Sequence, residues 1–284
     1  MQRSKNLLVS FSGGETSAFM AHWIKNHIED KYESVIYVFA NTGLENEETL
    51  EFVQTFSEQF GIYVYWVEAS VRHGERKGTG YWLTDFENAK RKGEPFEAVI
   101  QKYGITNTAW PHCTRELKMR PIHKFAKDYF DGEKYDTAIG IRQDEIDRID
   151  PMYKEKRFIY PLAFPDMMPS SKQKINFFWK NQSFRLDLKG YQGNCITCWK
   201  KSDPKLFQIY KENPNSFDFM KRMEKKYGID KNGNKVTFFR DGRSAEDMIE
   251  LAHSFNGKVL NDADVYNYQL DLMQETSCDI HSQC

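Results

Sequence analysis

The feature that most constrains the fold is a pair of adjacent glycines, Gly13 and Gly14, between an apolar run and an amphipathic run. The apolar run Asn6–Phe11 predicts a strand, and the spacing of apolar residues over 16–28 predicts a helix. Two glycines let the backbone turn sharply and approach a ligand closely, and the unpaired N–H groups of a first helical turn attract an anion. The sequence therefore predicts a phosphate site at a strand–turn–helix unit.

The donors for this site are the glycine amides and the hydroxyls around them. The candidate residues are Ser10, Ser12, Gly13, Gly14, Thr16 and Ser17. The stretch lacks the lysine of a Walker loop and the spacing of the dinucleotide fingerprint, so neither of those phosphate cradles is expected. The alternative is an ordinary strand-to-helix turn in which the serines and the threonine only cap the helix.

Strand-like and helix-like runs alternate through the first seventy residues. Apolar runs begin at positions 6, 34 and 62, and the segments 16–28 and 47–60 between them have helical periodicity. The runs are apolar at nearly every position, as in a parallel sheet covered by helices on both faces. We therefore expect a doubly wound, Rossmann-like α/β fold with a parallel sheet, whose ligands bind where the strands end.

The pattern changes after about position 165. We expect residues 1–165 to form the nucleotide-binding α/β domain and residues 166–284 to form an α-rich, cysteine-bearing region. Helical spacing is found at 170–182, 204–212, 216–227, 244–254 and 262–273, with a short strand-like stretch at 235–240. Between 70 and 109 the pattern breaks down, which favours a mobile loop or insertion, followed by one helix over 95–103.

Composition excludes several classes of protein. The 284 residues carry a formal net charge of -1, so no overall basic field points to nucleic acid. No apolar run approaches the roughly 20 residues of a membrane span, and the start of the chain does not read as a cleavable signal. We therefore expect a cytoplasmic protein with no membrane partner. Five cysteines without a secretion signal favour thiols, metal binding or catalysis over disulfides.

The cysteines give the second chemical signal. Cys195 and Cys198 have the Cys-x-x-Cys spacing by which two thiolates on a tight turn bind one metal centre. Cys113 is a candidate third ligand, and the tail adds Cys278 and Cys284. Three interpretations remain open, namely an iron–sulfur cluster, a structural zinc ion, or free thiols of which one is catalytic, because thiolates serve both kinds of metal centre.

Two further segments follow predicted strands at the ligand-binding edge. Residues 41–45 follow the second strand and should face the glycine loop across one site, although Asn41-Thr42-Gly43 by itself is only a turn signal. Gly140 ends another strand, and Arg142 and Arg148 after it could hold phosphate or sulfate oxygens in a forked geometry. The alternative for the two arginines is a surface charge network with the acidic residues beside them.

Taken together, these residues resemble the phosphoadenosine phosphosulfate (PAPS) reductase family, within the adenine nucleotide α-hydrolase, or ATP-pyrophosphatase, superfamily. The resemblance covers residues 5–202 and the last few residues. Residues 12–17 are similar to the pyrophosphate loop (PP-loop) of that superfamily. The other matching positions are Asn41-Thr42-Gly43, Cys113-Thr114-Arg115 with Lys118, Gly140-Ile141-Arg142 through Arg148, and Cys278-Asp279-Ile280-His281.

The resemblance implies an enzyme that binds an adenine nucleotide and performs sulfur chemistry beside its α-phosphate. One implied reaction reduces PAPS to sulfite, with Cys278 as nucleophile and a thioredoxin-like reductant. The other uses ATP, with magnesium, to adenylate an acceptor such as a nucleic acid, to which a sulfur donor then delivers sulfur. The resemblance also implies a four-iron four-sulfur cluster on Cys113, Cys195 and Cys198, with zinc as the alternative, and leaves Cys278 as nucleophile or fourth ligand.

Three positions depart from the family pattern. Thr16 stands where ATP-cleaving members carry aspartate, which bears on how magnesium is held. His112 precedes Cys113 where cluster-bearing reductases have two adjacent cysteines, and Ser277 and Asp279 replace glutamate and glycine beside the tail cysteine. A function of a different class is a non-catalytic, zinc-containing module that senses nucleotides or binds nucleic acid. The sequence does not give the oligomeric state.

Overall fold

The computed structural model describes residues 4–193, 195–257 and 259. In this part of the chain a six-stranded sheet has the order β4-β3-β2-β1-β5-β6. Its strands are β1 (Asn6–Phe11), β2 (Ser34–Asn41), β3 (Val64–Ser70), β4 (Gly80–Thr84), β5 (Tyr135–Ala138) and β6 (Phe158–Ile159). All neighbours pair in parallel except β3 and β4. The doubly wound α/β fold is confirmed, with an antiparallel edge strand that the sequence did not predict.

The chain order creates one switch point in the sheet. From β1 the chain winds outward through β2 and β3, and later returns to β5 on the other side of β1. The loops that follow β1 and β5 therefore diverge at the same edge, which is where open α/β sheets bind ligands. The glycine loop follows β1 and Gly140 follows β5.

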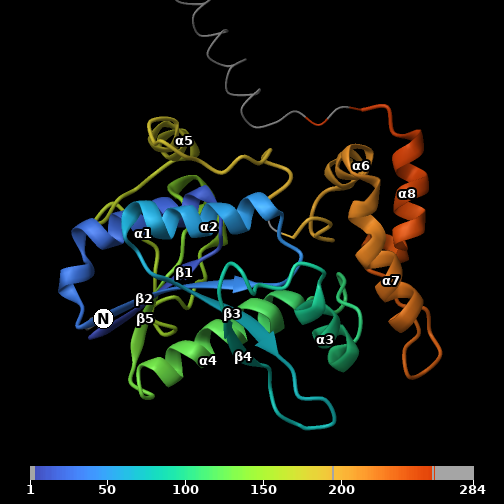
Figure 1. Ribbon diagram of the computed structural model, residues 1–284, viewed down its shortest axis with the longest axis horizontal. Coiled ribbons are helices and arrows are strands. Elements are labelled where there is room, and N and C mark those ends of the chain that lie inside the picture. The colour runs from blue at the N-terminus through green and yellow to red at the C-terminus, as the bar shows by residue number, and fades with distance from the viewer. Residues whose placement is uncertain (1–3, 194, 258, 260–284) are drawn as a thin grey trace, which may run out of the picture.

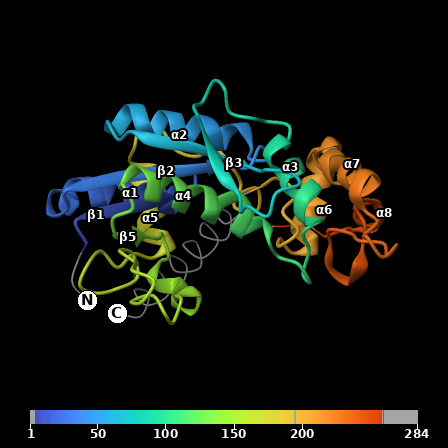
Figure 2. The ribbon, with the colours of Figure 1, turned by 90° about the horizontal axis from the view of Figure 1, so that it is seen from below.

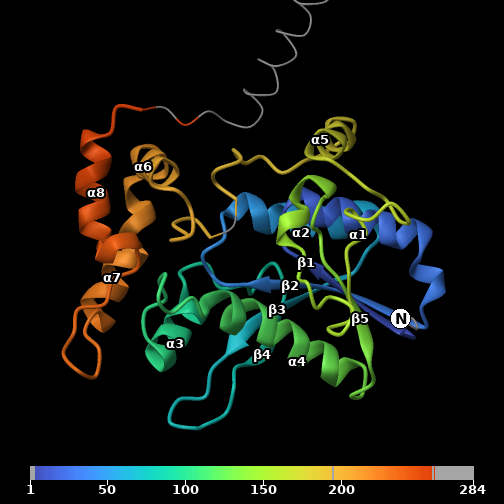
Figure 3. The ribbon, with the colours of Figure 1, turned by 180° about the vertical axis from the view of Figure 1, so that it is seen from behind.

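Helices cover both faces of the sheet (Figures 1 and 3). One face is covered by α1 (Glu15–His27), α2 (Glu47–Phe60) and α5 (Lys172–Lys180), and the other by α4 (Arg120–Tyr129). The central strand shows why both layers form, because Leu7 and Val9 pack into the α1 core while Leu8 between them packs into the α4 core. A strand with both faces apolar requires cover on each side.

The remaining helices form a separate layer beside the sheet (Figure 2). Here α3 (Glu94–Tyr103) packs with α6 (Asp203–Glu212), α7 (Asp218–Tyr227) and α8 (Ala245–Ser254). Their side chains share one core, which includes Phe96, Phe217, Met220 and Phe238. Short 3-10 helices η1 (Glu29–Lys31), η3 (Gln143–Arg148), η4 (Pro214–Phe217) and η5 (Arg240–Gly242) and the π-helix η2 (Thr114–Met119) complete the described elements.

Several details differ from the sequence predictions. The strand-like stretch at 235–240 forms no strand, and only an isolated bridge joins Ile229 to Lys235. The irregular segment after β3 contains β4, and the helix predicted near position 121 continues directly from η2. Helix α5 packs into the α1 core through Ile175 and Trp179, so the chain after position 165 first returns to the sheet. The domain boundary at 165 remains a prediction, and the helix predicted at 262–273 lies outside the described residues.

None of the helices in the described part of the chain has the length and apolarity needed to cross a bilayer.

Candidate active site

The glycine loop has a conformation that only glycine tolerates. Gly13 has a φ of 80°, in the left-handed region. A Cβ atom at this position would lie 2.7 Å from Cγ2 of Thr49 and 2.9 Å from Cε2 of Phe39. Gly14 follows in extended conformation as the N-cap of α1, so the helix's first N–H groups have no side-chain cap. These N–H groups are available to an anion.

Ser17 closes this loop from inside. Its hydroxyl donates to the carbonyl of Gly14 at 2.9 Å and accepts from the backbone N–H of Ser12 at 3.1 Å. The side chain of Ser12 lies 3.0 Å from the same hydroxyl, and Ser17 is only 4% exposed. The sequence interpretation gave Ser17 a direct phosphate contact, whereas the structure uses its hydroxyl to hold the loop. Ser12 is exposed, so its hydroxyl, which donates to Ser17 here, can turn toward a ligand.

The loop opens into a cavity of about 480 Å³, which we call the nucleotide cavity. Most of the residues predicted to bind phosphate line it together, namely Ser12, Gly13, Gly14, Thr16, Gly140, Arg142 and Arg148. Lys172 and Lys189 add two further cations that the sequence did not single out. Ser10 does not line the cavity; it pairs with Val38 inside the sheet. The arrangement suits a strongly anionic ligand.

The two arginines are held by neighbouring carboxylates. The guanidinium of Arg142 donates to Asp144 at 2.9 and 3.1 Å and lies 3.2 Å from Glu145. Arg148 also pairs with Glu145, which therefore bridges both arginines. The hydrogen bond from Arg142 lowers the pKa of Asp144. The charge network is confirmed, and because both arginines also line the nucleotide cavity, phosphate or sulfate binding by them stays a prediction.

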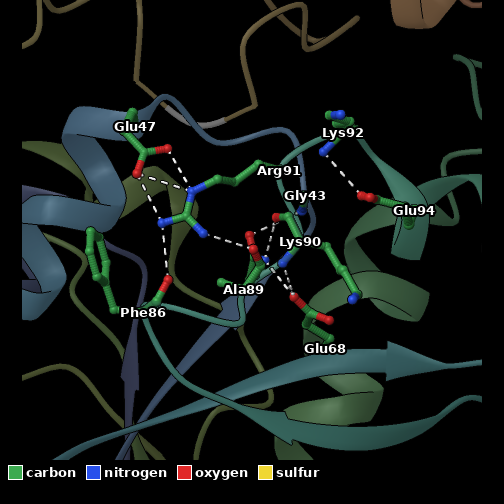
Figure 4. A network of polar contacts seen from close by, with 10 residues as sticks. Gly43, Glu47, Glu68, Phe86, Ala89, Lys90, Arg91, Lys92 and Glu94 are labelled. Carbon is green, nitrogen blue, oxygen red and sulfur yellow. Dashed lines mark hydrogen bonds and ion pairs between the residues drawn. The ribbon is translucent and has the colours of Figure 1, made fainter.

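The sequence analysis expected Asn41, Thr42 and Gly43 to face the glycine loop across one cavity. In the structure they do not line the cavity into which that loop opens. The buried amide of Asn41 donates to Glu68 at 2.7 Å and to the carbonyl of Lys90 at 2.8 Å. The carbonyl of Gly43 accepts from the N–H of Gly93 at 2.9 Å. Figure 4 shows how Arg91 joins the same loop to Glu47 of α2. Asn41 and Gly43 thus anchor a loop, and only Thr42 reaches a cavity.

That second cavity, of about 570 Å³, contains the cysteines and is called the thiol cavity here. Cys113, Cys195 and Cys198 line it together with Thr42 and Lys118. The loop that carries the Cys-x-x-Cys pair is fixed to the end of β2, because the N–H of Ile196 donates to the carbonyl of Leu44 at 2.9 Å. The structure therefore brings together cysteines that lie more than 80 positions apart in the sequence.

Buried charges surround the cysteines. Burial first, and then the carboxylate of Glu45, raise the pKa of Cys195 to about 12. Burial alone would lower the pKa of Lys118, but Cys195 and Glu45 outweigh it and raise that pKa, and the ammonium lies 3.6 Å from Glu45. Burial lowers the pKa of Lys201 to about 8, and its side chain donates to the carbonyls of Cys195 and Ile196. The sequence analysis gave neither Glu45 nor Lys201 a role beside the cysteines.

The donor set of the thiol cavity fits a soft metal centre. Thiolates select iron–sulfur clusters or zinc, and a bound cation is what stabilises the thiolate of a buried cysteine. As placed in the described part of the chain, no three potential ligand side chains are gathered closely enough to hold a metal ion. Cys278 and Cys284 lie outside the described residues. The cluster and its fourth ligand remain predictions.

The two cavities adjoin. Arg148, Gly190 and Gly193 line both of them. Between Gly190 and Gly193, the carbonyl of Gln192 accepts from the side chain of Asn46 at 2.9 Å. This hydrogen bond joins the shared wall to the start of α2. The nucleotide cavity and the thiol cavity therefore share part of their wall at Arg148.

Comparisons with known proteins agree with this geometry. Residues 6–106 match the model of the phosphoadenosine phosphosulfate reductase domain. The chain is 35% identical over 202 residues to an uncharacterized nin region protein of Escherichia phage lambda, covering 70% of this chain and 67% of the phage protein.

Two uncharacterized proteins of Methanocaldococcus jannaschii are more distant. One is 22% identical over 267 residues, which covers 91% of this chain and 57% of the archaeal protein. The other is 25% identical over 141 residues, covering 50% and 24% respectively. The domain match, the parallel sheet and the glycine loop at its switch point lead to one conclusion: this chain belongs to the phosphoadenosine phosphosulfate reductase family.

Proposed function

We propose that this chain is an adenine-nucleotide-dependent enzyme of sulfur chemistry. The observation that carries the proposal is the junction of the two cavities at Arg148, since it would place the reacting phosphate of a nucleotide beside three thiols. A substrate of this kind, PAPS or ATP, gains negative charge near its α-phosphate in the transition state. Preorganised donors at such a position are a large source of rate enhancement.

The glycine loop supplies the first donors. In the proposal, the N–H groups of Gly13 and Gly14 and the hydroxyl of Ser12 bind the α-phosphate at the positive end of α1. Arg142 and Arg148 then bind the outer phosphate or sulfate oxygens, for which their guanidinium groups must exchange Glu145 for the substrate. Thr16 offers no carboxylate to a bound magnesium ion, which in the proposal is held mainly by the phosphates of the nucleotide.

In the thiol cavity, Cys113, Cys195 and Cys198 would hold the metal centre. A four-iron four-sulfur cluster would supply sulfur transfer or redox chemistry there, and zinc would be structural. Cys278 is proposed as the nucleophile that attacks the sulfate sulfur, or as a fourth ligand. A thioredoxin-like reductant or a sulfur donor, and an acceptor such as a nucleic acid, are the proposed partners, with the cytoplasm as the location.

Product analysis on protein purified without oxygen tests the function. PAPS with reduced thioredoxin should yield sulfite if the chain is a reductase. ATP with magnesium and candidate acceptors should yield pyrophosphate if it is a sulfur transferase. Arg148→Ala should lower either rate by about two orders of magnitude, as loss of a transition-state contact does. Absence of both products from protein that binds its metal would contradict the proposal.

A further inference from the structure

Helix α4 carries a basic stripe on the face that points away from the sheet. Arg120, His123, Lys124 and Lys127 occupy positions i, i+3, i+4 and i+7, so they lie on one side of the helix. Phe125 and other residues of the opposite side are buried in the core under the sheet. The apolar side accounts for the packing of α4, and the basic side is left to solvent.

The stripe forms one wall of a groove. This open groove, of about 510 Å³, is lined by all four basic residues of α4 and, from the turn before β5, by Lys134 and one acidic residue, Glu133. Gly78 of the loop between β3 and β4 lies against Arg120, because a Cβ there would be 2.9 Å from its guanidinium. The same exposed loop carries Arg76 and Lys77. Neither of these two residues lines the groove, whose basic residues come from α4 and from the turn before β5.

Part of this charge has no internal partner. Arg120 pairs with the buried Glu116, and Lys124 pairs with Asp128. By contrast, Lys127 and Lys134 form no ion pair with any described residue, and the side chains of both are exposed. Burial lowers the pKa of His123, so this residue adds polar lining and not a positive charge at neutral pH.

We propose that this groove binds the sugar–phosphate backbone of a nucleic acid. At 1.5 Å per residue the stripe from Arg120 to Lys127 extends about 10 Å, a length along which a duplex presents several phosphates. The lysines and the arginine that line the groove suit phosphate groups, which are the same in every base sequence. Binding is therefore independent of base sequence.

This inference stands apart from the proposed chemistry. The groove lies on the α4 side of the sheet, whereas the glycine loop begins α1 on the other side (Figure 3). The π-helix η2, which starts directly after Cys113, runs into α4. Loss of groove binding should leave nucleotide affinity unchanged, so a failure here is distinguishable from a failure of the proposed function.

A charge-reversal pair tests the groove. Fluorescence anisotropy with a labelled 20-base-pair DNA duplex of mixed sequence measures binding by the full chain. Lys127→Glu/Lys134→Glu should weaken binding by about tenfold or more and flatten its salt dependence, because about two phosphate contacts are lost. The matched control is Lys225→Glu/Lys231→Glu, which changes the net charge equally in the exposed C-terminal layer and should leave binding within about twofold.

Further arms identify the ligand and guard against unfolding. Anisotropy with duplex RNA of the same length shows whether the groove binds DNA or RNA more tightly. Tighter binding of either duplex supports the proposal. Melting temperatures of both variants should equal that of the wild type. Equal weakening in the two variants, or no binding by the wild type at low salt, would overturn the inference. So would full competition by inorganic phosphate at the concentration of duplex phosphates, because a single phosphate would then suffice.

Discussion

The hydroxyl of Thr42 lies 3.4 Å from the sulfur of Cys195, although 153 positions separate the two residues. The same hydroxyl donates to the carboxylate of Glu45, which also accepts the backbone N–H of Thr42 at 2.9 Å. Thr42 directly follows the last residue of β2, and Cys195 belongs to the loop that precedes α6. The contact therefore joins the two parts of the chain at the thiol cavity.

Thr42→Val tests this junction. The substitution keeps the side-chain shape but leaves a buried carboxylate with one donor fewer, so it should lower the free energy of unfolding by about 1–3 kcal/mol. Chemical denaturation measures the change. Thr137→Val is the control, because this buried threonine of β5 makes no side-chain hydrogen bond in the described part of the chain. A loss at Thr137 as large as at Thr42 would contradict the assignment.

The two serines of the glycine loop should separate into two roles. Ser17→Ala removes the hydroxyl that closes the loop, so both stability, by about 1–2 kcal/mol, and nucleotide affinity should fall. Ser12→Ala removes an exposed hydroxyl, so affinity should fall while stability changes by less than about 0.5 kcal/mol. Thermal unfolding and calorimetric titration measure the pair. Identical profiles for the two variants would show that the distinction is wrong.

An ion pair between α3 and α7 should make a small, pH-dependent contribution. Glu97 accepts from Lys226 at 2.7 Å and from the hydroxyl of Tyr227 at 3.2 Å, and the lysine bond chiefly lowers the pKa of Glu97. The pKa of Glu97 is lower in the folded state than its unfolded value near 4.5, so the ionised carboxylate stabilises the fold at pH values above 4.5. This stabilisation is lost as the pH falls through the folded-state pKa.

Glu97→Gln should therefore cost no more than about 1 kcal/mol at pH 7, because both partners are partly exposed. The difference from wild type should vanish in acid, once both forms are uncharged. Melting temperatures at pH 7 and at successively lower pH check the trend. A difference in melting temperature between wild type and variant that grows as the pH falls would show that the carboxylate of Glu97 does not stabilise the fold as expected.

The metal centre is tested by composition. Protein purified without oxygen should contain iron and sulfide and absorb broadly in the visible range, and Cys195→Ser or Cys198→Ser should remove most of the iron. Cys284→Ser, which changes a cysteine outside the proposed ligand set, should retain it. Nucleotide affinity should persist in all three variants. A colourless protein with one zinc ion would contradict the cluster, and a metal-free protein would contradict both assignments.

Much of the fold was predictable because its signals are local. The bounds of α2, Glu47–Phe60, follow from helical periodicity, and the buried strands follow from unbroken apolar runs. Edge strand β4 escaped prediction because its side chains are not consistently buried, with Trp82 67% and Leu83 58% exposed. Such a strand is defined by pairing with β3 and not by an inward-facing pattern.

The site was predictable only in part, because residue type does not show where a side chain points. The hydroxyl of Ser17 could bind a ligand or its own loop, and the sequence does not distinguish the two. In the structure it donates to the carbonyl of Gly14 in the loop. Asn41 was assigned to the nucleotide by position, yet Glu68 and Lys90 take its amide. The pairing of Glu45 with Lys118 joins a strand end to a distant helix, and no local pattern records such a contact.

Nucleotide binding by two glycine variants tests the central claim most directly. Gly13 and Gly61 both have positive φ, but an added Cβ meets Thr49 and Phe39 at the first position and nothing within 4 Å at the second. The account predicts that calorimetric titration with ATP and with PAPS finds tight binding of at least one to wild type and to Gly61→Ala. It predicts a loss of about tenfold or more in Gly13→Ala. Equal affinity in all three proteins would contradict it.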